Sequence, residues 1–112
     1  MIIELYKELK KRFPQHIIFI KAGDFHETFD ADAEKVSERT GITKTKREGV
    51  ASVGVGPFDS YRVLEQVLRT DPIIICHDYS NNNGKYYYDA YSYFESFDSK
   101  HLMQGSIRRV VR

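Results

Sequence analysis

Residues 21–29, Lys-Ala-Gly-Asp-Phe-His-Glu-Thr-Phe, combine side chains that could contact a ligand directly. They follow a short apolar run that is typical of a buried strand. Gly23 allows the backbone to turn there, and Asp24 stands where the N-cap of a following helix belongs. We therefore expect Phe25 and Glu27 to be presented at the mouth of a strand-to-helix junction, an unusual place for an exposed aromatic ring and a carboxylate.

The same residues also allow an interpretation without any ligand. Asp24 and Glu27 have the spacing of a capping box, in which two side chains satisfy free N–H groups at the start of a helix. Phe25 precedes Phe29 by four residues, so both rings could belong to the apolar stripe of that helix. Pattern alone favours the core interpretation for Phe25.

A second group of residues invites a metal or nuclease interpretation. Cys76, His77 and Asp78 follow one another, and His26 and Glu27 are also adjacent. Metal sites need three or four converging ligands, and the spacing here follows no known ligand motif. Cys76 ends an apolar run, so we expect it to be a small buried hydrophobic residue and expect no metal or other cofactor.

Composition sets broad limits on the class of protein. The 112 residues suffice for one domain with a single core, and 41% of them are hydrophobic. The formal net charge of +1 is a weak attraction for phosphates. The single cysteine excludes an internal disulfide and fits a reducing compartment. No apolar segment has the length of a membrane span, and the N-terminus does not resemble a signal peptide, so a cytoplasmic protein is expected.

Periodicity and turn residues predict an α/β (α+β) fold, a mixed sheet flanked by about three helices. The expected helices are residues 2–13, 29–40 and about 60–68, and the expected strands are residues 17–20, 42–46, 50–55, 73–76 and 85–94. Asp32 should point outward from the second helix, and Gly41 should end it. The expected apolar face of the third helix is Tyr61, Leu64, Val67 and Leu68.

Two hairpins and an ambiguous C-terminus complete the prediction. Residues 47–49 should turn a hairpin, and residues 54–57 should form a loop. The turn signal at residues 80–84 should join the strand at 73–76 to the tyrosine-rich segment. Residues 107–112 fit either a last strand or a frayed basic tail.

The chain resembles the N-terminal mismatch-recognition domain (domain I) of the MutS family of DNA mismatch repair proteins. The resemblance rests first on Gly23, Asp24, Phe25, Glu27 and Phe29. It is clearest over residues 5–79, and it does not cover residues 95–112. No Gly-x-x-x-x-Gly-Lys-Ser/Thr loop is present, so no ATPase chemistry is expected.

In that family the matching phenylalanine and glutamate probe mispaired bases. The resemblance implies that Phe25 enters from the minor groove, stacks on a mispaired base and kinks the duplex, and that Glu27 hydrogen-bonds the displaced base. Such a wedge discriminates by deformability rather than by sequence. His26 should face solvent or phosphate. The expected phosphate contacts are Lys21, Lys44, Lys46 and Arg47, although a solvated hairpin edge explains the last three equally well, and Arg108, Arg109 and Arg112 could add a basic tail.

The resulting hypothesis is a stand-alone, non-catalytic module, residues 1–112, that binds mismatched or bent double-stranded DNA. Without further domains its affinity should be weak, so a protein partner or self-association is expected, with the tyrosine-rich strand as the candidate surface. The alternative is a protein-interaction domain that keeps the fold without DNA binding. The low net charge favours this alternative, whereas an exposed Phe25 ring would disfavour it.

Overall fold

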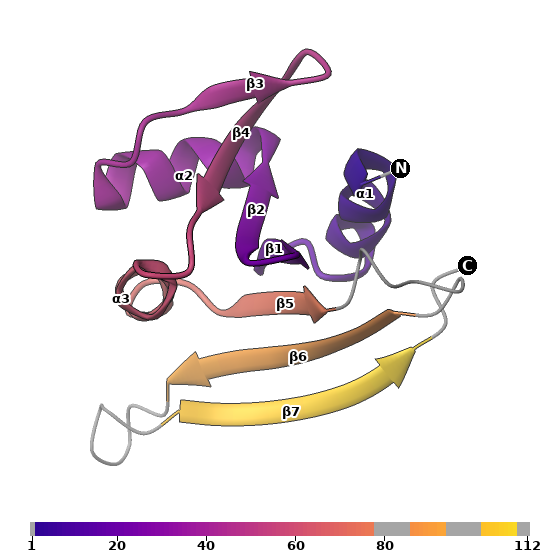
Figure 1. The fold of residues 1–112 in the computed structure, drawn as a ribbon. Coiled ribbons are helices and arrows are strands. Elements are labelled where there is room, and N and C mark those ends of the chain that lie inside the picture. Colours follow the sequence, from indigo (N-terminus) through magenta and orange to yellow (C-terminus); the bar gives the residue numbers. More distant parts are fainter. Residues whose placement is uncertain (1, 78–85, 94–101, 110–112) are drawn as a thin grey trace.

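The computed structural model describes residues 2–77, 86–93 and 102–109, which form one mixed sheet with helices on both faces (Figure 1). The strand order is β3-β4-β2-β1-β5-β6-β7, and β1 runs parallel to β5 while the other pairs are antiparallel. The elements are α1 (Ile2–Arg12), β1 (Ile17–Ala22), β2 (Phe25–Phe29), α2 (Asp30–Thr40), β3 (Thr45–Arg47), β4 (Val50–Val55), α3 (Ser60–Leu68), β5 (Ile73–His77), β6 (Tyr86–Tyr93) and β7 (Leu102–Arg109). The predicted α/β class with three helices is confirmed for these residues.

Alternate residues of the central strands divide the core into two apolar clusters. Ile18 and Ile20 pack with α1, so we call that side of the sheet the α1 face. Ile17 and Phe19 pack with α2 and α3, so we call the other side the α2–α3 face. Because both faces of β1 are covered, its sequence reads as an unbroken apolar run, as expected for a central strand.

The segment after β1 differs from the prediction in a way that matters for the site. Gly23 turns the chain as expected, with φ 62°. Residues 25–29, however, form strand β2, which is hydrogen-bonded to both β1 and β4, and the helix begins only at Asp30. Asp24 and Glu27 therefore form no capping box, and Phe25 and Phe29 share no helical stripe. Asp30 adopts φ 56°, and this left-handed residue turns the strand into α2.

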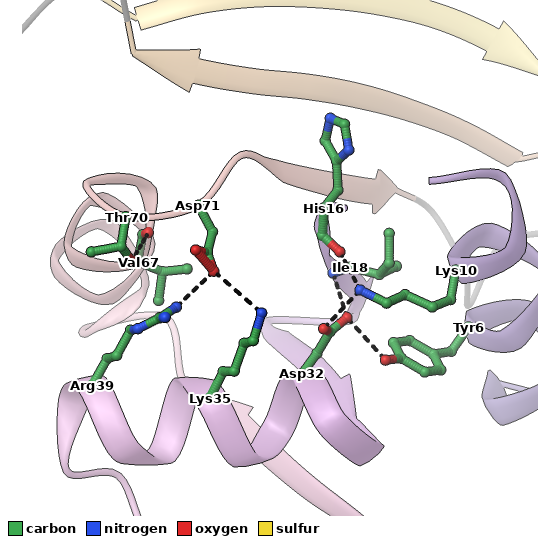
Figure 2. A network of polar contacts seen from close by, with 10 residues as sticks. All are labelled: Tyr6, Lys10, His16, Ile18, Asp32, Lys35, Arg39, Val67, Thr70 and Asp71. Carbon is green, nitrogen blue, oxygen red and sulfur yellow. Dashed lines mark hydrogen bonds and ion pairs between the residues drawn. The ribbon is translucent and has the colours of Figure 1, made fainter. Parts of the chain in front are cut away.

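Asp32 is buried, which contradicts the expected outward orientation (Figure 2). Its Oδ2 accepts hydrogen bonds from the Tyr6 hydroxyl at 2.9 Å and from the Ile18 N–H at 3.0 Å, and its Oδ1 lies 2.9 Å from Lys10 Nζ. The paired register of β1 and β2 ends at Ile20, so Asp32 accepts the N–H that β2 leaves free. The carboxylate thus joins α1, β1 and α2. Burial raises the pKa of Tyr6, and the neighbouring Asp32 carboxylate acts in the same direction.

The predicted turns at Gly41 and at residues 47–49 are confirmed, whereas Gly54 and Val55 belong to β4 and not to a loop. The predicted apolar face of α3 is confirmed for Leu64, Val67 and Leu68 but is wrong for Tyr61. Gly41 ends α2 with φ 81°, and the β3–β4 turn places Gly49 at φ 80°. On α3 the buried residues are Val63, Val67 and Leu68, whereas Tyr61 is 78% exposed. The four-residue spacing of the two valines sets the buried face, so Tyr61 belongs to the exposed rim of the helix.

The tyrosine-rich segment forms a hairpin with β5 as predicted, but it is not an exposed edge. β6 lies between β5 and β7, Tyr88 is buried, and Tyr87 and Tyr91 are half-buried. The interaction surface expected there is therefore largely internal to the sheet. Of the two C-terminal alternatives, residues 107–109 belong to strand β7, while residues 110–112 and the turn at residues 80–84 lie outside the described residues.

Helices long and apolar enough to cross a membrane do not occur among the residues that the structure describes.

Candidate nucleic-acid interface

Phe25 begins β2 with a side chain that is 51% exposed, although it is a large apolar residue. It pairs with Ala22 of β1, which packs in the α1-face cluster, so the ring projects on the α1 face. The ring also lies against the backbone of β4: a Cβ built on Gly56 would be 3.5 Å from it, and one on Gly54 would be 3.9 Å away. One side of the ring thus packs on the backbone of Gly54 and Gly56, which we call the glycine floor, and the other side is open to solvent.

Sequence reasoning missed this glycine floor, because it assigned both residues to a loop. Gly54 lies within β4, opposite Glu27, and Gly56 directly follows the strand. The signal was present in the two-residue spacing of the glycines, which places both on the side of the sheet that carries Phe25. A bare backbone at those positions lets an aromatic side chain rest on the sheet.

Glu27 lies on the same face as Phe25, because the two residues are separated by two positions on one strand. Its side chain is only 16% exposed, and its Oε1 accepts a hydrogen bond from Arg47 Nη1. Arg47 reaches it from the end of β3, opposite Val50, which packs against the α1-face cluster. Phe25, Glu27 and Arg47 therefore lie on the α1 face, with Glu27 partly covered, and we call them the Phe-Glu-Arg cluster.

The three predicted lysines do not join this cluster. Lys21 pairs with His26 on the α2–α3 face, and its Nζ donates to the carbonyl of Gly23 at 2.7 Å. Lys46 lies opposite Ala51, whose side chain packs in the α2–α3 cluster. Lys44 forms a 2.9 Å ion pair with Glu34 of α2. Alternation along the strands thus separates Lys21 and Lys46 from Phe25, and the ion pair with Glu34 holds Lys44 at α2.

His26 is buried, which contradicts the expected contact with solvent or phosphate. It alternates with Phe25 on β2 and so points to the covered α2–α3 face, where its Nδ1 has no hydrogen-bond partner among the described residues. Burial lowers the pKa of His26 from 6.5 to about 4, and the charges of Lys21 and His77 act in the same direction. The imidazole beneath the Phe-Glu-Arg cluster is therefore neutral at physiological pH.

We expect this buried histidine to make the domain less stable in mild acid. Below pH 6.5 the unfolded chain takes up a proton at His26 that the folded domain does not accept until about pH 4. Between pH 7 and pH 4.5 wild type should lose about 2 kcal/mol more unfolding free energy than His26→Gln, which has no titrating group at this position. Urea denaturation at both pH values measures the difference, and parallel losses in the two proteins would contradict it.

The proposed small-residue role of Cys76 is confirmed, since the side chain is fully buried in the α1-face cluster. His77 contacts Asp89 of β6 at 2.8 Å, and Asp78 lies outside the described residues. No group of three or more potential metal ligands converges within the described ranges.

Together these features define a small α/β domain that presents a supported aromatic ring, a carboxylate and an arginine on one face of its sheet. The family model described as MutS domain I matches residues 1–111. The chain belongs to this family.

Curated relatives give the same result. The chain is 33% identical to the DNA mismatch repair protein MutS of Borreliella burgdorferi over 84 residues, which are 74% of this chain and 10% of that protein. It is 39% identical to the MutS of Treponema pallidum and 41% identical to that of Petrotoga mobilis, in each case over 68 residues, 61% of this chain and 8% of the relative. The chain thus spans about a tenth of the length of these relatives.

Proposed function

We propose that this domain binds mismatched or distorted double-stranded DNA through Phe25 and Glu27, without catalysing a reaction and without a cofactor. The observation that carries the proposal is the 51% exposed Phe25 ring, which rests on Gly54 and Gly56 and can enter a duplex without unfolding the domain. Membership of the MutS domain I family supports the same function. Phe25 acts as the wedge, and Glu27 bonds the base that the wedge displaces.

Selectivity in this mechanism comes from the cost of opening the base stack. Unstacking costs a few kcal/mol per base step, and it costs less where pairing is already poor. A single wedge therefore enters a mismatch or a bulge more readily than a matched site. The cations Lys44 and Lys46 lie away from the cluster, so they would contact phosphates beyond the wedge or none at all.

The test is a fluorescence anisotropy titration at low salt with three duplexes that are matched, G·T-mismatched or bulged by one base. We expect the two distorted duplexes to bind more tightly than the matched one. The dissociation constants should lie at about 10⁻⁴ to 10⁻⁶ M, a range typical of weak binding driven by phosphate contacts. Equal affinity for all three duplexes, or no binding, would refute the proposal.

A second candidate function is binding to a protein partner, and one observation favours it. Phe58 is 99% exposed and Tyr61 is 78% exposed, both near the start of α3. Exposed large apolar side chains are often protein contacts. If no duplex binds, this rim of α3 becomes the place to search, in preference to the tyrosine-rich strand.

A further inference from the structure

Arg47 lies where it can control the carboxylate that the proposed function requires. Its Nη1 donates to Glu27 Oε1, so the guanidinium already has a carboxylate partner in the DNA-free domain. The Arg47 side chain is 44% exposed, whereas that of Glu27 is only 16% exposed. The arginine therefore lies on the outer side of the pair, with the carboxylate beneath it.

The backbone around Arg47 holds it in place for this contact. Arg47 is the last residue of β3 and pairs with Val50 of β4 across a tight turn. The two turn residues, Glu48 and Gly49, both have positive φ, at 53° and 80°, as a two-residue hairpin turn requires. A residue at the base of such a turn has a fixed position relative to β4, and β4 is in turn bonded to β2, which carries Glu27.

Charge gives a reason for the pair to exist on a surface that meets DNA. A free carboxylate facing phosphates is repelled by them. An arginine bound to it removes that repulsion, and the planar guanidinium, with five N–H donors, also fixes the orientation of the carboxylate. Glu27 can then be held ready beside Phe25 at no net charge.

We propose that Arg47 is a positioning residue for Glu27 and thereby sets the preference for mismatched over matched duplex, instead of serving as a phosphate contact. This inference rests on the proposed function. Arg47 acts through the carboxylate: it holds Glu27 at a defined place on the strand that carries Phe25. Removing the guanidinium releases a charged side chain that no longer has a fixed position.

The experiment compares Arg47→Gln with Lys46→Gln, measuring the ratio of the dissociation constants for matched and G·T-mismatched duplex. Lys46 is the matched control because it is the preceding residue on β3 and carries the same charge, and because its side chain has no ion pair or hydrogen bond among the described residues. We expect Arg47→Gln to lower the ratio about fivefold, Lys46→Gln to leave it unchanged, and Arg47→Lys to restore part of it.

A double-mutant cycle separates positioning from phosphate binding. In the Glu27→Ala background, Arg47→Gln should change the ratio no further, because the side chain through which Arg47 acts is absent. A phosphate contact would instead weaken matched and mismatched binding equally in both backgrounds and reduce the salt dependence by about one ion. Urea denaturation verifies that each variant is folded.

The outcomes distinguish this inference from the proposed function. A wild-type protein without any preference for mismatched DNA would refute the proposed function, and this inference with it. A selective wild-type protein whose ratio is unchanged by Arg47→Gln would refute the inference alone and return Arg47 to the role of a phosphate contact.

Discussion

Replacing Asp32 with alanine is expected to lower the free energy of unfolding by about 3 kcal/mol. The substitution leaves the Tyr6 hydroxyl and the Ile18 N–H buried without their acceptor, and each such loss costs about 1–3 kcal/mol. Lys10 loses its ion-pair partner as well, but its side chain is 28% exposed and regains contact with water. The two buried donors therefore account for most of the expected loss.

Urea denaturation at pH 7 measures the effect, and Asp71→Ala is the matched control. Asp71 is also an acceptor for α2, but its partners Arg39 and Lys35 are 32% and 51% exposed (Figure 2). Water can replace the carboxylate there, so we expect a loss of about 1 kcal/mol or less. Equal losses for the two variants would show that Asp32 is not the buried junction described above.

Replacing Phe25 with alanine is expected to remove the preference for mismatched DNA, weakening the binding of G·T-mismatched duplex about tenfold. Stacking of an aromatic side chain on a base contributes about 1–3 kcal/mol, and 1.4 kcal/mol corresponds to a factor of ten. Matched duplex should bind almost as before, because the wedge does not enter it. The fold should be little affected, since half of the ring is already in solvent.

Anisotropy titrations of the variant with matched and mismatched duplex measure this change. Phe58→Ala is the control for general loss of an apolar surface, because Phe58 is 99% exposed and lies in the loop before α3. It should keep the preference. If Phe58→Ala and Phe25→Ala had the same effect, the wedge mechanism would be wrong. The two aromatic residues would then contribute only nonspecific apolar contacts to DNA.

The secondary structure could be predicted from the sequence wherever the residue pattern fits only one type of element. The run at residues 17–20 is too short and too rich in isoleucine for a helix, and Gly41 and Gly49 stand at positions where a positive φ is needed. The pattern of residues 25–29, in contrast, fits both a helix and a strand. Phe25 and Phe29 satisfy the four-residue period of a helix, while Phe25, Glu27 and Phe29 satisfy the two-residue period of a strand.

Pairing with neighbours far along the chain decided that ambiguity. β2 lies between β1 and β4, and the ladder with residues 52–55 cannot be read from the local sequence. The same assignment moved His26 into the core and separated Lys21 and Lys46 from Phe25, since neighbouring strand residues point to opposite faces. The predicted outward orientation of Asp32 was wrong for a related reason. A charged residue on a helix is usually solvated, and the partners that bury Asp32 come from α1 and β1, which are distant in the sequence.

The parallel pairing of β1 with β5 has a consequence for how the domain is made. Ile17 lies beside Ile73, so the centre of the sheet cannot close until the chain has been synthesised through β5. Before that point β1 and β2 can already form their hairpin, but the other edge of β1, which pairs with β5 in the folded domain, has no partner. Such an edge invites wrong pairing between chains. Refolding should therefore be slower and more sensitive to protein concentration than the small size of the domain suggests.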